Sequence, residues 1–285
     1  AVARAGRRWA ISGGRGVPAV ESLARGAGLG LALLSAAAVL AGLGSLALWS
    51  VAGSWSFPDA LPQTLTLRNW ERHGPALAGP FAETLMIAAA ATAAAVALTI
   101  ACLEAEHRHG LTPTTRSLWL LYLPLLVPQV AFLLGLQTLA LGAGARDGRL
   151  AVIAAHLVFV LPYVFLSLAD PWRAWDTRHG TVARALGATA GRTLLAVRLP
   201  MLLRPILTAA AVGFAVSVGQ YLPTLLIGGG RVATLTTEAV ALAAGGDRRL
   251  IGVTALAQTA AVILPFALAL ALPRIVFRNR RGLHV

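Results

Sequence analysis

The chain has 285 residues, of which 57% are hydrophobic and only 12% are charged, whereas soluble domains usually carry about 25% charged residues. This composition excludes an ordinary soluble domain and predicts a membrane protein. The formal net charge of +13 is carried by arginines that gather in a few loops, and the single cysteine, Cys102, excludes an intramolecular disulfide.

The chain begins with an arginine-rich segment that precedes the first apolar run. Five arginines lie between residues 4 and 25, and the apolar run covers about residues 27–48. The apolar region of a cleaved secretory signal is only about 7 to 15 residues long, so this run favours a retained membrane anchor. We therefore expect residues 1–26 to form a cytoplasmic N-terminal segment or linker.

Six segments are long and apolar enough to cross a bilayer as helices. A hydrocarbon core needs about 20 apolar residues per span, and none of the six carries Asp, Glu or Arg in its interior. A charged side chain at a span's centre costs about 2.5 to 3.5 kcal/mol on insertion scales. The sequence predicts an all-α polytopic membrane protein, with its transmembrane domain at residues 27–273 and its spans at 27–49, 84–103, 118–142, 150–168, 206–227 and 251–273.

The arginines indicate the orientation, because cytoplasmic loops carry an excess of positive charge. The N-terminal segment, the loop 104–117, the loop 169–205 and the tail 274–285 carry 17 arginines, against 7 in the other loops. Both termini and the loop 169–205 are therefore expected in the cytoplasm, and the loops 50–83, 143–149 and 228–250 outside. Topology accounts for the positive charge, which argues against a nucleic-acid partner.

Proline and tryptophan mark further points along the spans. Proline removes an intrahelical hydrogen bond, so kinks and local backbone openings, as along a transport path, are expected in four spans. These prolines are Pro124, Pro128, Pro162, Pro223 and Pro265. Tryptophan favours the membrane interface, so interface anchors are expected at Trp49, Trp55, Trp119 and Trp172.

Several kinds of chemistry lack the residues that they need. The phosphate-binding pattern GxxxxGK[ST] requires a lysine, and the chain has none. No nucleophile and base converge in the pattern, and no Cys/His cluster has metal-ligand spacing. The carboxylates lie in loops or at span ends, which disfavours a carrier with its own proton or sodium coupling. We expect no catalytic residue, no cofactor and no metal.

A few polar side chains fall within the spans. Gln220 and Tyr221 lie beside Pro223 and are the leading candidates to line a solute path, with plain interhelical bonding as the alternative. Gln129 and His156 are further candidates. For His156 a helix–helix hydrogen bond is the favoured interpretation, because buried polar groups in lipid seek partners.

The loop 169–205 contains the stretch ARALGATAGRTLLAVRLP. Leu186, Ala190, Leu194 and Val197 fall at helical spacing and predict one apolar stripe. Glycine costs about 1 kcal/mol inside a helix relative to alanine, so Gly187 and Gly191 predict two short helices. Such a segment either docks a partner or lies on the membrane surface, and physical reasoning leaves both readings open.

The spacing from Gly187 through Val197 to Leu199-Pro200 resembles the EAA loop of binding-protein-dependent ABC transporter permeases. That pattern runs Glu-Ala-Ala, three residues, Gly, nine residues, Ile, one residue, Leu-Pro. Here Thr181 stands in place of the glutamate, and only Ala183 matches the two alanines. The resemblance covers about residues 80–273 and implies the type I (MetI-like) importer fold.

The resemblance also implies partners and roles. The loop would dock on a cytoplasmic ABC ATPase dimer that hydrolyses ATP for a permease with no enzyme activity of its own. The implied coupling residues are Ala183, Arg184, Leu186, Gly187, Val197, Leu199 and Pro200. A periplasmic binding protein and a second permease half would complete a bacterial inner-membrane importer, whether the chain is a separate subunit or one half of a fused permease.

The solute is a more open question. The stretches FVLPYVFLSLADPWRAWD and VGQYLPTLLIGGGRVATLTTEAVALA resemble thiamine-type uptake permeases. Permeases for iron, polyamines and inorganic anions share the scaffold and stay as alternatives. A membrane-embedded enzyme or scaffold without an ATPase is the alternative from another class.

Overall fold

The computed structural model describes residues 18–56, 58–142, 144 and 148–276. This part of the chain is helical throughout apart from its connections, and its one β-type contact is an isolated bridge between Ala52 and Leu65. The all-α prediction is confirmed. Residues 1–17 of the expected N-terminal segment and residues 277–285 of the expected tail lie outside the described residues.

Four helices are long and apolar enough to span a membrane unaided: α2 (Pro18–Val51), α3 (Arg68–His109), α6 (Gly148–Arg173) and α13 (Arg248–Val276). Each contains one predicted span and continues beyond it. The expected outer loop 50–83 is therefore too long, since α3 already begins at Arg68. Its first turns are too polar for a hydropathy window but contain good helix formers such as Ala, Leu and Glu.

The predicted span 118–142 is not one continuous helix. It consists of α4 (Thr115–Leu126) and α5 (Gln129–Gly142), whose axes differ by 106°. Pro128 explains the break, because a residue before proline is driven out of the helical region, and Val127 is extended with φ −86° and ψ 141°. The proline effect was expected, but its outcome here is a sharp turn in the middle of the predicted span.

The predicted span 206–227 is also divided. Helix α10 (Leu203–Val218) ends before Gly219, and a short α11 (Leu222–Gly228) follows with Pro223 in its first turn, where proline is well tolerated. The loop 228–250 then contains a helix that the sequence did not predict, α12 (Leu235–Gly245). By length and composition, the described residues contain up to six spans if two bent pairs each count as one, α4 with α5 and residues Ala190–Met201 with α10. This number equals the predicted one, but the second pair includes part of the predicted loop 169–205 instead of α11.

The centre of the bundle is formed by α3, α6 and α10, which pack against one another. The buried core includes Val160, Val164 and Leu168 of α6 and Ala209 of α10. A Cβ atom at Gly213 would lie 2.6 Å from Val164 Cγ2, so this glycine permits the close contact between α6 and α10. Helix α13 packs on α10 and on α2, while the most apolar window of α2 has no residue buried within the chain.

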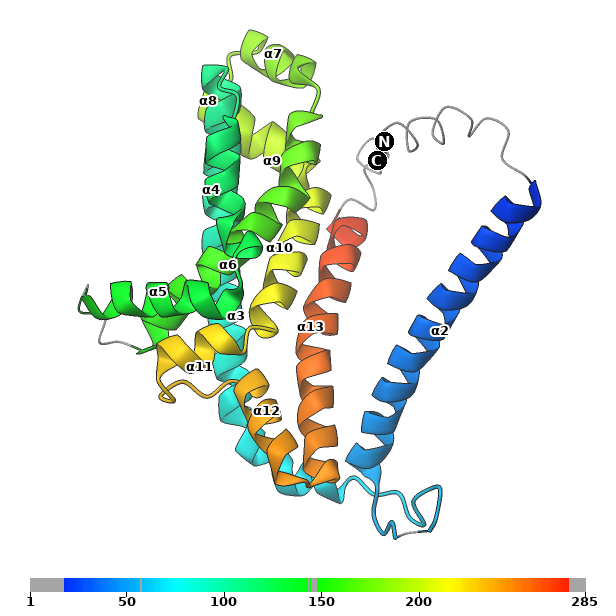
Figure 1. The fold of residues 1–285 in the computed structure, drawn as a ribbon. Coiled ribbons are helices and arrows are strands. Elements are labelled where there is room, and N and C mark those ends of the chain that lie inside the picture. The colour runs from blue at the N-terminus through cyan, green and yellow to red at the C-terminus, as the bar shows by residue number, and fades with distance from the viewer. Residues whose placement is uncertain (1–17, 57, 143, 145–147, 277–285) are drawn as a thin grey trace, which may run out of the picture.

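The short helices of the loop 169–205 lie at one end of the bundle, together with the first turn of α2 and the last turn of α13 (Figure 1). Helices α11 and α12 lie toward the opposite end (Figure 1). The placement of these two ends on the cytoplasmic and outer sides of a membrane stays a prediction. Two regions could carry function, namely the loop at one end and the polar side chains of the predicted spans.

Candidate functional site

The loop between α6 and α10 contains two short α-helices, α7 (Thr177–Ala185) and α8 (Ala190–Thr193). A π-helical turn, η2 (Leu194–Arg198), and the single turn α9 (Leu199–Met201) then lead into α10. Asp176 and Thr189 cap α7 and α8 by accepting hydrogen bonds from backbone N–H groups. The expectation of two short helices is confirmed.

Gly187 forms the turn between α7 and α8. Its φ is +85°, and its N–H donates to the carbonyl oxygen of Arg184 at 2.9 Å. This left-handed conformation is disfavoured for residues with a Cβ atom. A Cβ atom at this position would meet no atom within 4 Å. Within this chain Gly187 therefore serves the backbone turn rather than a close contact.

The single apolar stripe predicted along the loop does not form. The turn at Gly187 redirects the chain, so the helical spacing from Leu186 to Leu194 is interrupted. Leu186 is 84% exposed, whereas Leu194 and Val197 pack against the buried core. The loop consequently divides into an outer part, with Val182 and Leu186 exposed, and an inner part that is anchored to the bundle.

The inner part includes the second half of the recognised motif. Val197 and Leu199 pack on the core cluster that contains Leu202 and Trp172. Pro200 lies in the first turn of α9, and the helical segment Ala190–Met201 meets α10 at an angle of 74°. The loop is thus connected to α10 through a packed joint.

Arg198 is the centre of that joint, although the sequence analysis did not single it out. It is 3% exposed, and its guanidinium donates to Glu104 Oε2 and to the carbonyl oxygen of Trp172, both at 2.9 Å. The guanidinium also lies 4.5 Å from the ring of Trp172 and 4.8 Å from that of Trp175. These contacts connect the loop to α3 and to the end of α6.

Two signals could have identified this joint. Arg198 lies inside the VRLP stretch of the motif, and Glu104 stands four residues before Arg108, with which it pairs at 2.7 Å. Trp172 was expected to anchor at the membrane interface, and this prediction is wrong. Its ring is buried, with the residue 1% exposed, because it stacks on Arg198.

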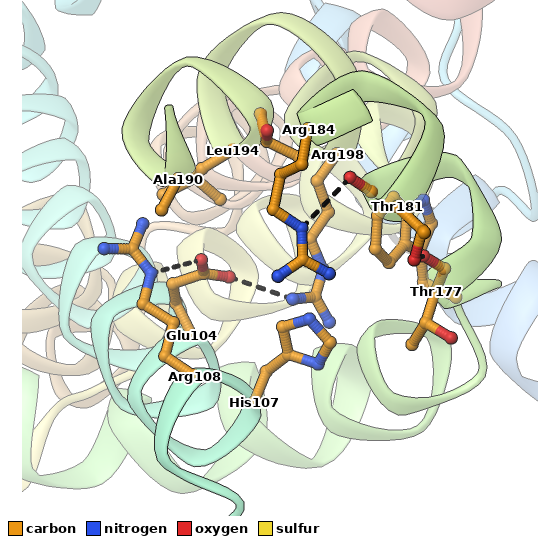
Figure 2. Close-up of a pocket in the computed structure, with 12 residues that line it drawn as sticks. Glu104, His107, Arg108, Thr177, Thr181, Arg184, Ala190, Leu194 and Arg198 are labelled. Carbon is orange, nitrogen blue, oxygen red and sulfur yellow. Dashed lines mark hydrogen bonds and ion pairs between the residues drawn. The ribbon is translucent and has the colours of Figure 1, made fainter. Parts of the chain in front are cut away.

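A pocket of about 540 Å³ lies between the end of α3 and the loop helices. Figure 2 shows the side chains of Arg184, Arg198 and His107 pointing into this space. Glu104 and Arg108 lie along one side, and the hydroxyl-bearing Thr177 and Thr181 of α7 lie along another (Figure 2). The candidate coupling residue Arg184 therefore faces a defined, charged pocket.

A smaller cavity of about 260 Å³ lies within the bundle beside the break between α4 and α5. Gln129, Tyr163 and Gln220 supply its polar lining. Gln220 is 6% exposed, and neither atom of its side-chain amide has a hydrogen-bond partner in the part of the chain that the structure describes. A buried amide without a partner costs about 1–3 kcal/mol, so this cavity is suited to a polar ligand.

His156 and Tyr221 lie apart from this cavity's lining. The two ring nitrogens of His156 are hydrogen-bonded to the hydroxyls of Ser217 at 2.8 Å and Thr224 at 2.9 Å. His156 therefore joins α6 to α10 and α11. Tyr221 is half-buried and directly precedes α11. Among the described residues, no group of three His, Cys, Asp or Glu side chains could hold a metal ion.

Comparison with known proteins also indicates a membrane transport protein. Residues 97–282 match the family described as "Binding-protein-dependent transport system inner membrane component". The chain is 40% identical over 172 residues to the inner membrane ABC transporter permease protein YnjC of Escherichia coli (strain K12). This alignment covers 60% of the chain and 34% of YnjC, so the chain spans about a third of that relative.

Two further relatives carry a transported substance in their names. The molybdenum transport system permease protein ModB of Mycobacterium bovis is 30% identical over 182 residues, covering 57% of the chain and 68% of ModB. The putrescine transport system permease protein PotI of Escherichia coli (strain K12) is 29% identical over 159 residues, covering 53% of the chain and 57% of PotI. With the helical fold, the motif of the loop and the match over residues 97–282, the chain belongs to the family of binding-protein-dependent transport system inner membrane components.

Proposed function

We propose that the chain is the permease subunit, or one part of a longer permease, of an ATP-binding cassette importer. It moves a small solute across the bacterial inner membrane and hydrolyses no ATP itself. The observation that carries this proposal is the loop α7–α8, which exposes Leu186 at one end of the bundle and is anchored to α10 at its other end. A family member with such a loop has a ready surface for an ATPase.

The outer part of the loop is the proposed ATPase contact. Ala183, Arg184 and Leu186 lie at the end of α7, and Gly187 turns the chain so that this end projects. Exposed apolar side chains such as Leu186 gain about 25 cal/mol per Å² when a partner covers them. Thr181, which replaces the family's glutamate, is a neutral residue and contributes no ion pair to this contact.

The inner part of the loop is the proposed transmission element. Val197, Leu199 and Pro200 hold the loop at a bend of 74° to α10. Closure of an ATPase dimer would pull on α7 and α8 and tilt α10 through this joint. Because α10 ends next to Gln220, the tilt would reach the cavity in the bundle and alternate its access between the two sides.

We infer that the 260 Å³ cavity belongs to the solute path. The unpartnered amide of Gln220 and the neighbouring Gln129 offer a donor and an acceptor to a passing solute. Tyr221 directly follows Gln220 and precedes α11, and His156 fixes α10 and α11 relative to α6. Tyr221 and His156 therefore position the residues of the solute path rather than line it.

The solute candidates are a thiamine-like compound, from the sequence resemblance, and the molybdenum and putrescine of the relatives' names. Iron, other polyamines and other inorganic anions stay as alternatives. The cavity lining contains no charged side chain, which supports selection by the periplasmic binding protein rather than by the permease. Binding of these compounds to the cognate binding protein, measured by calorimetry, discriminates between them.

The proposed domain arrangement has a transmembrane unit at residues 27–273, preceded by a cytoplasmic segment or linker at 1–26 and followed by a cytoplasmic tail at 274–285. The outer loops, including α12, face the binding protein, and a second permease half completes the path. Reporter fusions near residues 190 and 240 test this orientation. A cytoplasmic signal at 190 and a periplasmic signal at 240 are expected, and the reverse pattern would overturn it.

The function itself is tested by reconstitution. The chain is co-expressed with an ABC ATPase, a binding protein and a second permease half from the same genome, purified, and placed in vesicles. We expect solute uptake only when ATP is present on the side of the ATPase. Turnover of a substrate by the chain alone, or failure to retain any ATPase, would favour a membrane-embedded enzyme or scaffold instead.

A further inference from the structure

The 540 Å³ pocket beneath the loop has an unbalanced set of charges. Its lining includes the three arginines Arg108, Arg184 and Arg198 but only one carboxylate, that of Glu104. Both oxygens of this carboxylate already accept hydrogen bonds, Oε1 from Arg108 at 2.7 Å and Oε2 from Arg198 at 2.9 Å. The positive charge of Arg184 therefore has no carboxylate left to it in the pocket.

Several hydrogen-bond donors of the pocket are also unused. Arg198 Nε and Trp175 Nε1 are buried and have no hydrogen-bond partner within the described residues. The hydrogen bond that Arg184 makes, from Nε to the carbonyl oxygen of Gly180 at 3.3 Å, leaves its two terminal nitrogens available. Buried donors rarely stay unpaired. Free donors and excess positive charge together indicate an acceptor that carries negative charge.

The position of the pocket indicates where this anion comes from. Thr177, Thr181 and Arg184 recur at the spacing of one face of α7 and line the pocket, while Val182 and Leu186 form an adjacent, exposed face. A partner that covers Leu186 would lie beside the pocket. A small free anion would make no use of this apolar face.

We propose that the pocket binds an aspartate or glutamate side chain of the cytoplasmic ATPase subunit, with Arg184 as its main ionic contact. This inference rests on the proposed function, since it needs an ATPase on the loop. It reverses the charges expected from the family motif. The permease, with Thr181 in place of glutamate, supplies the cation, and the ATPase supplies the carboxylate.

The absence of lysine from the chain allows a direct test. Arg184→Lys introduces its only side-chain amine, and Arg192→Lys does the same at an exposed position of α8 that does not line the pocket. The purified complex with its ATPase is treated with a carbodiimide, which joins a carboxylate to a touching amine as an amide and takes up the oxygen as a urea. We expect peptide mass spectrometry to find an ATPase acidic residue linked to position 184, and no comparable link from position 192.

Binding measurements provide the second arm. Arg184→Gln should weaken ATPase retention by about tenfold, as for loss of a partly buried ion pair, and Arg192→Gln by less than about twofold. An intact complex without an ATPase link at position 184, equal links from both positions, or a link to Glu104 alone would overturn the proposal and leave the proposed function standing. Phosphate binding by the chain alone that Arg184→Gln abolishes would identify a free anion and also overturn it. Failure of the unmodified chain to retain an ATPase would refute both the proposed function and the proposed carboxylate contact.

Discussion

The buried joint around Arg198 makes the sharpest prediction. Arg198 and Arg108 both contact the carboxylate of Glu104, but Arg198 is buried and the Arg108 side chain is 39% exposed. Replacing each arginine by glutamine gives a matched pair of variants. Arg198→Gln should strongly destabilise the loop and uncouple ATP hydrolysis from transport, and Arg108→Gln should change little.

The magnitude follows from the contacts that each variant loses. Arg198→Gln removes a charge-assisted hydrogen bond to Glu104 and two ring contacts at 4.5 and 4.8 Å. A hydrogen bond to a charged group contributes about 1.5–3 kcal/mol, and a cation–π contact about 1–2 kcal/mol when desolvated. After the relief of arginine desolvation, the expected loss is about 3–5 kcal/mol, as for other buried pairs broken from one side. The exposed Arg108 pair contributes about 0.3–0.5 kcal/mol.

Thermal unfolding of the purified complex, followed by size-exclusion chromatography after heating, measures the difference. The midpoint should fall by about 10 °C in Arg198→Gln and by less than about 2 °C in Arg108→Gln. ATP hydrolysis should persist in Arg198→Gln while uptake is lost. Equal midpoints for the two variants, or a full rate of uptake in Arg198→Gln, would refute the assignment of Arg198 as the joint.

Three further variants test separate parts of the structure. Gly187→Val, at φ +85°, should destabilise the turn by about 1–2 kcal/mol and reduce ATPase co-purification without blocking membrane insertion. A variant that keeps its ATPase and transports normally would contradict the proposal that the end of α7 docks on the ATPase. Gln220→Leu should abolish uptake while stability stays unchanged or rises, because the amide of Gln220 has no partner among the described residues. Gln137→Leu, which loses a 3.1 Å hydrogen bond to the Leu226 carbonyl oxygen, should lower stability instead. The opposite ranking of the two melting midpoints would exclude a role for Gln220 in the solute path. Gly213→Ala should lower the melting midpoint through crowding worth about 1–3 kcal/mol, and Gly219→Ala, whose Cβ would have only ordinary contacts at 3.6 Å or more, serves as its control.

Much of the fold could be predicted from the sequence because its strongest signals are local. Long apolar runs without charges identify the four unbroken spans, and the glycines of the loop predict its division into α7 and α8. The spacing from Gly187 to Pro200 led to the family. Each of these features lies within one short stretch of chain, where composition and periodicity determine the outcome.

The features that were missed depend on distant parts of the chain. Pro128 predicted a kink, but a turn of 106° between α4 and α5 also depends on the neighbouring helices against which the two halves pack. Arg198 reads as one more cytoplasmic arginine, because the sequence does not reveal that Glu104, 94 residues earlier, lies beside it. Trp172 was assigned to the membrane interface for the same reason, since its real partner is Arg198.

The central claim is that the exposed end of α7 docks on an ATPase while the opposite end of the bundle faces away from it. A photoreactive amino acid at Leu186, which is 84% exposed, and another at Val240 of α12, which is 44% exposed, test this claim in the assembled transporter. The account predicts that the probe at position 186 cross-links to the ATP-hydrolysing subunit and that the probe at position 240 does not. An ATPase cross-link from position 240, or none from position 186 in an intact complex, would contradict it.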